Sequence, residues 1–184
     1  GNNALTFDKK GKVDAAIINE GNITAKEAGL VGFVAPNVVN AGVIIANVGR
    51  AHLASGDTAT VDLYGDGLMQ VAVSDDIESQ LVANTGVIEA NGGKIALTAA
   101  AGKDIVNSLI VAEGVLKSQS IGIQNGEIII SAAGSNKTDK QGNSNVIVQA
   151  SLDVSGRKAG ERGGKLTVTG DNVALGDGTV IDES

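Results

Sequence analysis

Cysteine is absent from this sequence, and proline, histidine and methionine each occur once, at Pro36, His52 and Met69. Without cysteine there is no disulfide framework, no thiol nucleophile and no cysteine-based zinc site. Aromatic residues make up only 2% of the chain, so a hydrophobic core must be built from valine, isoleucine, leucine and alanine. No apolar run approaches the ~18 residues of a membrane-spanning helix, and the sequence therefore predicts no membrane span.

The amino-terminal residues lack the basic and apolar regions of a signal peptide, so we expect the 184 residues to be a fragment of a longer protein. Glycine accounts for 26 positions, about twice the usual ~7%. A bundle of helices would lose about 1 kcal/mol at each interior glycine, whereas a chain that turns often can use them. The net charge is −7, and no basic cluster offsets it, so we expect no nucleic-acid partner.

A seven-residue motif recurs along the chain. It is Asn-Glu-Gly-Asn-Ile-Thr-Ala at 19–25, Asn-Ala-Gly-Val-Ile-Ile-Ala at 40–46 and Asn-Thr-Gly-Val-Ile-Glu-Ala at 84–90, with a looser copy, Ala-Glu-Gly-Val-Leu-Lys-Ser, at 112–118. The first two copies begin 21 residues apart, and the third begins 44 residues further on, close to twice that step. A short strand that recurs at a period in the twenties is typical of a solenoid with stacked coils.

Short stretches of alternating apolar and polar residues lie around these copies. The clearest is 145–154, where every even position is apolar and most odd positions are polar. This pattern predicts a strand with one buried and one solvated face. Three such strands and three glycine-containing corners fit into about 21 residues, which is the geometry of a parallel β-helix. The sequence therefore predicts an all-β protein, a single β-helix over 1–184 with roughly seven three-strand coils.

Three stretches depart from the period, and we expect insertions near 63–80, 99–111 and 135–145. The last is wholly polar and is expected to be an exposed loop. Inward residues of a solenoid contact the coils above and below, whereas insertions face water. The segments 64–76 and 135–145 are therefore predicted to project from the coils and to be the contact surfaces.

Two longer stretches carry a more specific resemblance. They are Asn-Glu-Gly-Asn-Ile-Thr-Ala-Lys-Glu-Ala-Gly-Leu-Val-Gly-Phe-Val-Ala-Pro-Asn-Val at 19–38, followed by Asn-Ala-Gly-Val-Ile at 40–44, and Leu-Ala-Ser-Gly-Asp-Thr-Ala-Thr-Val-Asp-Leu-Tyr-Gly-Asp-Gly-Leu at 53–68. Both closely resemble the large exoproteins of the filamentous haemagglutinin type, which are substrates of bacterial two-partner secretion. The resemblance is strong over roughly 15–100 and looser over 145–184, where it rests on Ser-Leu-Asp-Val-Ser-Gly and Gly-Gly-Lys-Leu-Thr-Val-Thr-Gly.

The resemblance implies a right-handed parallel β-helix, passage through an outer-membrane transporter, and display as a secreted or cell-surface adhesin or stalk. The secretion domain of that family carries Asn-Pro-Asn motifs, and this chain contains none. We therefore expect the segment to lie downstream of the secretion domain. The resemblance implies no catalytic residues.

His52 is the one candidate general base, because Ser55 and Asp57 follow it closely in the sequence. A catalytic triad needs the three side chains to meet in space, which proximity in sequence does not provide. Since His52 alternates with the apolar residues Ala51 and Leu53, we expect it on the solvent face of a strand. The sequence predicts no catalytic residue.

Acidic residues at Asp62, Asp66, Asp75 and Asp76 are candidates for acid–base chemistry or calcium binding. The run from Asp62 lacks the Asp-x-Asp-x-Asp-Gly spacing of a calcium loop and carries Val73 at its twelfth position. We expect solvated turn residues, no metal site and no cofactor. The motif asparagines at 19, 40 and 84 fall at equivalent corners, so their amides are expected to hydrogen-bond from coil to coil.

The leading hypothesis is a non-enzymatic structural or adhesive module of a secreted bacterial exoprotein, which contacts a host-cell or glycan surface through its faces and loops. Two alternatives stay open. In the first, exposed strand edges at the two ends let the coils associate end to end into a filament. In the second, carboxylates that face one groove make the chain a polysaccharide-degrading β-helix enzyme.

Overall fold

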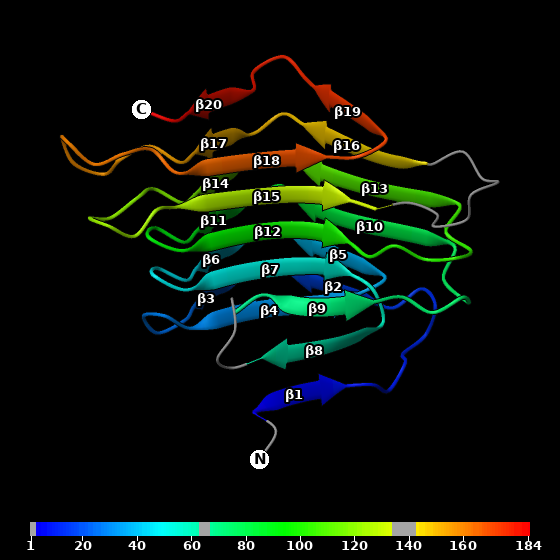
Figure 1. Ribbon diagram of the computed structural model, residues 1–184. Coiled ribbons are helices and arrows are strands. Elements are labelled where there is room, and N and C mark those ends of the chain that lie inside the picture. The colour runs from blue at the N-terminus through cyan, green and yellow to red at the C-terminus, as the bar shows by residue number, and fades with distance from the viewer. Residues whose placement is uncertain (1–2, 63–66, 134–142) are drawn as a thin grey trace.

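The computed structural model describes residues 3–62, 67–133 and 143–184. Every regular element in these residues is a β-strand. Three parallel sheets wrap around a shared apolar core, and a small antiparallel sheet lies against one side (Figure 1). The predicted all-β parallel solenoid is confirmed.

The three parallel sheets are named here by the order in which each coil visits them. The first sheet contains β2 (Ala16–Asn19), β5 (Asn37–Asn40), β10 (Ser79–Asn84), β13 (Asn107–Ala112), β16 (Ser144–Val148) and β19 (Asn172–Leu175). The second sheet contains β3 (Asn22–Thr24), β6 (Val43–Ile45), β11 (Val87–Glu89), β14 (Val115–Lys117), β17 (Ser151–Asp153) and β20 (Val180–Asp182). The third sheet contains β4 (Leu30–Ala35), β7 (Arg50–Ser55), β12 (Lys94–Ala99), β15 (Glu127–Ala132) and β18 (Lys165–Thr169).

The antiparallel sheet, called the side sheet below, contains β1 (Ala4–Phe7), β8 (Thr58–Asp62) and β9 (Met69–Ala72), with β8 in the middle. Because β8 and β9 lie between the second and third coils, they explain why the motif spacing there is 44 residues instead of 21. The described residues form five complete coils and two strands of a sixth. This is fewer than the roughly seven predicted, because the side sheet and the loops use residues that the prediction assigned to coils.

The predicted insertions have other bounds where the structure describes them, and the first lies between Ser55 at the end of β7 and Ser79 at the start of β10 and contains β8 and β9. Within the 63–80 stretch, β9 folds back onto the coils, with Met69 buried, and β10 begins at Ser79, so the described part of 64–76 does not project as expected. Within 99–111, β12 ends at Ala99 and β13 begins at Asn107. Most of the polar 135–145 loop lies outside the described residues, and β16 begins at Ser144.

The core is a set of vertical columns in which one apolar side chain lies above another. Ile23, Ile44 and Ile88 are in register in the second sheet, as predicted, and the column continues through Leu116 and Leu152. Ile44, Ile88 and Leu116 are fully buried. Each side chain of this size contributes about 1.5–3 kcal/mol by leaving water. Small aliphatic side chains therefore stabilise the coils mainly through repetition, and Phe33 on β4 also packs against this core.

The motif asparagines form a column of their own at the corner between the first and second sheets. The side-chain amide of Asn19 donates to Oδ1 of Asn40 at 2.7 Å, and that of Asn40 donates to Oδ1 of Asn84 at 2.8 Å. The Asn84 amide donates to the carbonyl of Glu113 at 3.0 Å, where the column ends. Coil-to-coil hydrogen bonding by these residues is confirmed.

The motif glycines are required because neighbouring coils come very close at two corners. At the first corner, a β-carbon on Gly42 would overlap the carbonyl oxygen of Gly21, and one on Gly86 would overlap that of Gly42. At the corner before the third sheet, a β-carbon on Gly93 would overlap the carbonyl oxygen of Gly49. Glycine is needed at these positions because its missing side chain lets backbone approach backbone.

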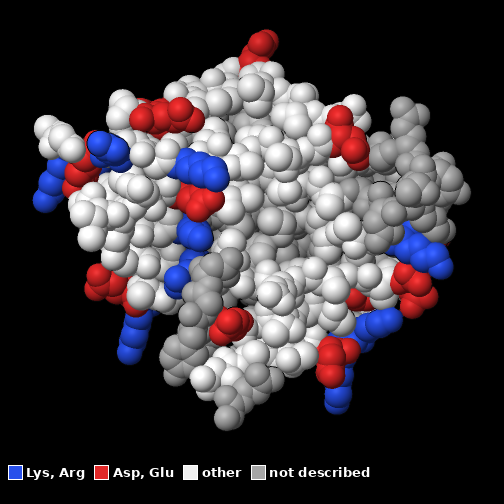
Figure 2. Space-filling model, viewed as in Figure 1, with Lys and Arg blue, Asp and Glu red and all other residues white. Residues whose placement is uncertain are grey.

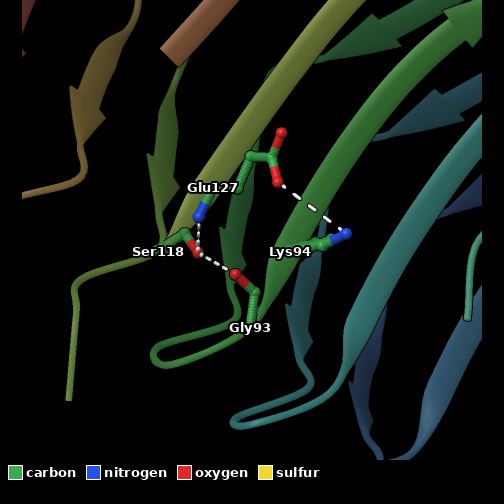
Figure 3. A network of polar contacts seen from close by, with 4 residues as sticks. All are labelled: Gly93, Lys94, Ser118 and Glu127. Carbon is green, nitrogen blue, oxygen red and sulfur yellow. Dashed lines mark hydrogen bonds and ion pairs between the residues drawn. The ribbon is translucent and has the colours of Figure 1, made fainter. Parts of the chain in front are cut away.

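Ser118 replaces the final alanine of the motif in its fourth copy and joins three segments at one corner (Figure 3). Its hydroxyl is within 2.8 Å of the Gly93 carbonyl oxygen and accepts a hydrogen bond from the backbone N–H of Glu127 at 3.1 Å. Glu127 also forms an ion pair with Lys94 at 3.8 Å, on the outside of the third sheet. A partly exposed pair of this kind adds at most about 1 kcal/mol, so the buried serine is the more important link.

We expect Ile44→Asp to destabilise the protein severely, because it places an unpaired charge in a fully buried column. Loss of the side chain alone should cost about 2–5 kcal/mol. Ile18→Asp is the matched control, since Ile18 is 62% exposed on the outside of β2. Urea denaturation followed by circular dichroism measures both. Equal stability of the two variants would contradict the buried column.

Asn40→Ala should lower the free energy of unfolding by about 1–3 kcal/mol, because it leaves buried amide groups of Asn19 and Asn84 without their partner. Asn145→Ala is the control. It removes a similar amide pair, Asn172 to Asn145 at 3.1 Å, from the outside of the first sheet, and should cost less than about 0.5 kcal/mol. The same denaturation measurement applies, and a loss in Asn40→Ala no larger than in the control would show that the buried asparagine column adds little.

Candidate interaction surfaces

His52 is buried, at 3% exposure, and the prediction of a solvent-facing histidine is wrong. Its side chain does point to the outside of β7, but β9 covers it there. The backbone N–H of Met69 donates to Nδ1 at 3.1 Å, and Nε2 lies 2.7 Å from the hydroxyl of Thr98. Because Nδ1 accepts a hydrogen bond, the proton of the neutral ring is on Nε2. The histidine thus ties β9 to the third sheet.

Ser55 and Asp57 do not join His52 in a catalytic arrangement. The Ser55 hydroxyl is buried and donates to the carbonyl of Pro36 at 2.7 Å. The carboxylate of Asp57 accepts hydrogen bonds from the backbone N–H and the hydroxyl of Ser74. Each of the three side chains therefore has a separate structural role at the junction between the coils and the side sheet.

Of the acidic candidates, Asp62 is the exposed last residue of β8 and not the turn residue that was expected. Asp75 and Asp76 are exposed and follow Ser74 in a turn that is anchored by the buried side chain of Ile77. Asp66 lies outside the described residues. Across the described ranges, no group of three or more histidine or carboxylate side chains is arranged to hold a metal ion.

The outer face of the first sheet carries an apolar row. Its members alternate with the buried core residues of the same strands and are in register from coil to coil: Ile18, Val39, Ala83, Val111 and Ile147. Ile18 and Ile147 are exposed, and the others are half-buried. The outer face of the second sheet has a similar row of half-buried valines, Val43, Val87 and Val115.

Charges are placed mainly at the ends of strands. Figure 2 shows, on the face formed by the third sheet and the side sheet, a column of charged side chains left of the centre, further charges around the margin, and a mostly uncharged area between them. At the start of the third-sheet strands, Arg50, Lys94, Glu127 and Lys165 are in register. The outer face of the second sheet carries a further column of charged residues, Glu89, Lys117 and Asp153, which are also in register.

The side sheet has one apolar and one polar face. Its inner face carries Leu5 and Phe7 on β1, Ala59 and Val61 on β8, and Met69 and Val71 on β9. Val61 and Met69 pack against Ala54, Leu30 and Val34 on the outside of the third sheet. The opposite face carries Thr6, Thr60 and Gln70, which are in register with one another. This alternation explains how the sheet docks on the coils.

A cavity of about 430 Å³ lies between the side sheet and the first coil. Its walls are largely apolar and include Phe7, Ile17 and Val34, and the charged residues Lys9 and Asp57 also line it. Sequence reasoning missed this cavity and the side sheet. The signal was present in the alternation of Thr-Ala-Thr-Val at 58–61 and of Leu-Thr-Phe at 5–7.

Comparisons with known proteins give one informative match, and no family model matches the chain. A heme/hemopexin-binding protein of Haemophilus influenzae is 32% identical over 109 residues, which is 59% of this chain. The aligned region is 11% of the length of that protein, so the chain spans only a small part of it.

The described part of the chain has no helix with the length and apolar character of a membrane crossing.

The last two coils carry carboxylates with lowered pKa values. Hydrogen bonds from the hydroxyl of Ser144 at 2.7 Å and from its backbone N–H at 3.1 Å lower the pKa of Asp171 from its ordinary 3.8. A hydrogen bond from the backbone N–H of Gly122 at 2.7 Å is the main cause of the lowered pKa of Glu161, whose ordinary value is 4.5. Both carboxylates link segments that are far apart in the sequence.

A lowered folded-state pKa means that the stabilisation by Asp171 is complete above its ordinary value of 3.8 and is lost as the pH falls through the folded pKa. We therefore expect Asp171→Asn to lower the melting temperature near pH 7 and to lose this effect progressively as the pH falls below 3.8. Asp75→Asn, at an exposed turn, controls for the change in net charge. Thermal melting of the three proteins across this range tests the prediction, which fails if the effect of Asp171→Asn does not depend on pH.

Proposed function

We propose that this chain is a structural and adhesive segment of a secreted bacterial exoprotein. The observation that carries the proposal is the unbroken register of the coils, in which buried apolar columns run through all three sheets. The buried polar side chains Asn40 and Ser55 form hydrogen bonds between neighbouring coils. A stack of this kind is a rigid support whose outer faces can vary without disturbing the interior. Similarity to part of a heme/hemopexin-binding protein supports a place in a large binding protein.

The proposed contact surface is the outer face of the first sheet, where apolar side chains lie in register from coil to coil. The net charge of −7 disfavours polyanionic partners, and the apolar row on the first sheet favours a protein or an uncharged glycan on a host-cell surface. We further propose that the exoprotein reaches the surface through an outer-membrane transporter, as the filamentous haemagglutinin resemblance implies. The chain itself acts without catalysis in this proposal.

A second candidate function is binding of a haem-carrying protein, which the name of the Haemophilus influenzae relative favours. In that case the chain contributes a protein–protein contact. His52, its single histidine, is buried with a hydrogen-bonding contact at each ring nitrogen, so the imidazole is not arranged to ligate haem iron.

The test is to measure binding of the purified, fluorescently labelled chain to immobilised host-cell membranes, a panel of uncharged glycans, and haem-loaded hemopexin. Val111→Lys places a charge in the apolar row of the first sheet, and we expect it to weaken binding about tenfold or more. Val87→Lys makes the same change on the second sheet and is the control for the change in charge.

The same protein is incubated with a panel of polysaccharides, and released reducing sugar is measured. Binding to hemopexin alone would favour the second candidate over cell or glycan adhesion. Failure to bind any of the three surfaces would contradict an adhesive role, and release of sugar would contradict the proposal that the chain is not an enzyme.

A further inference from the structure

Two buried side-chain oxygens in the described part of the chain form no hydrogen bond with another protein atom. They are Oε1 of Gln80 and Oγ of Ser108. Gln80 is 3% exposed, and Ser108 is fully buried. Buried polar groups of native proteins nearly always have a partner, so each of these atoms requires an explanation.

Both residues lie where the chain passes from the third sheet to the first sheet of the next coil, called the third corner below (right side of Figure 1). Gln80 on β10 and Ser108 on β13 are in register on neighbouring parallel strands. Each is buried and adjoins an outward residue of its strand, so both side chains point into the coils. Neighbouring strands are about 4.8 Å apart, and this separation suits a small molecule that bridges the two side chains.

The orientation of the Gln80 amide follows from its own hydrogen bonds. Nε2 donates to the carbonyl of Ser55 at 3.3 Å and to that of Ala100 at 2.9 Å. Because carbonyl oxygens only accept hydrogen bonds, the amide nitrogen must be the atom that contacts them. Oε1 is therefore the end of the amide that still needs a donor.

The surroundings of Ser108 supply no protein partner for its hydroxyl. Ser144 is in register with it on the next coil, but the Ser144 hydroxyl donates to Asp171 at 2.7 Å and accepts from the Asp171 backbone N–H at 2.9 Å. The third-sheet strands β12 and β15, which both contact β13, end here in Ala99 and Ala132. These short side chains leave more space than the isoleucines and leucines that fill most of the core.

We propose that a single water molecule binds inside the third corner and bridges Gln80 and Ser108. It donates one hydrogen bond to Oε1 of Gln80 and forms another with the hydroxyl of Ser108, which can donate or accept. Water is favoured over a metal ion, because the site offers two uncharged side-chain oxygens, whereas hard divalent cations take about six or more oxygen ligands.

The bridge continues a series of polar links between coils at this corner. Ser55 donates to the carbonyl of Pro36, and Gln80 donates to the carbonyl of Ser55. The water carries the series on to Ser108, beside the residues 100–106 that leave the stack between β12 and β13. It holds two coils together where the repeat is interrupted, and it does not depend on the proposed adhesive function.

Ser108→Ala tests the bridge by the sign of its effect on the melting temperature. With a bridging water, the variant leaves Gln80 Oε1 without a partner, and the melting temperature should fall by about 2–4 °C. Without the water, the variant removes a buried hydroxyl that bonds to nothing, and the melting temperature should stay the same or rise. Ser151→Ala, at a half-buried position on the outside of β17, controls for the exchange of serine for alanine in a strand. A fall in Ser108→Ala no larger than in this control overturns the proposal.

Gln80→Met provides a second test, because it keeps the length of the side chain and removes the amide oxygen. In this background the water has already lost one partner, so adding Ser108→Ala should no longer lower the melting temperature. An equal fall in both backgrounds would show that the two residues are not joined and would overturn the bridge. Circular dichroism of each variant confirms that it is folded before melting.

The bound molecule is identified directly on the full chain. Oxygen-17 relaxation dispersion of the solvent counts long-lived bound water, and Ser108→Ala should lose one such water relative to the parent; no loss contradicts the proposal. Melting in NaCl, KCl and choline chloride at equal ionic strength tests for a monovalent cation. Equal melting temperatures support water, whereas stabilisation by sodium or potassium that disappears in Ser108→Ala would show a cation in the site and overturn the assignment to water.

Discussion

The close vertical stacking of one coil on the next is the constraint on which the rest of this structure depends. Adjacent parallel strands lie about 4.8 Å apart, and at the glycine corners the backbones approach until no side chain fits between them. Each coil must therefore place its corners directly above those of the coil below. The apolar columns and the asparagine column follow from this register. Equivalent residues of successive coils lie directly above one another, one strand spacing apart, so like side chains meet.

The stacking rule also explains how the chain accommodates residues that break the period. Extra residues between the second and third coils leave the stack, form β8 and β9, and return to the outside of the third sheet. The junction is held by specific contacts, since Met69 packs against the outside of the coils and donates its backbone N–H to His52. His52 and Asp57, which the sequence offers as candidates for catalysis, thus hold the side sheet and the turn after it on the coils.

The arrangement separates the interior, which repeats, from the outside, which varies. Inward positions carry mainly small aliphatic side chains, together with polar groups that form hydrogen bonds between coils. Outward positions carry neutral rows on the faces and charges at the strand ends. Outward side chains of the described strands can therefore differ from coil to coil without disturbing the buried columns.

Much of the fold was predictable because stacked coils need the same residue types at a regular spacing in the sequence. The Asn-x-Gly-x-Ile motif specified the first-sheet corner, the second-sheet strand and the columns of Ile44 and Asn40, since each of these needs the same residue type at the same step. The number of coils was overestimated because spacing alone does not distinguish a longer coil from an added hairpin.

Only the tertiary structure decided the surroundings of the outward residues. Alternation correctly placed His52 on the outside of its strand, but its burial depends on β9, which comes from a later part of the chain. Leu5 and Phe7 likewise share the inner face of the side sheet because β1 pairs with β8, more than 50 residues away. Periodicity fixes which side of a strand a residue occupies, whereas long-range packing determines whether that side meets solvent or another sheet.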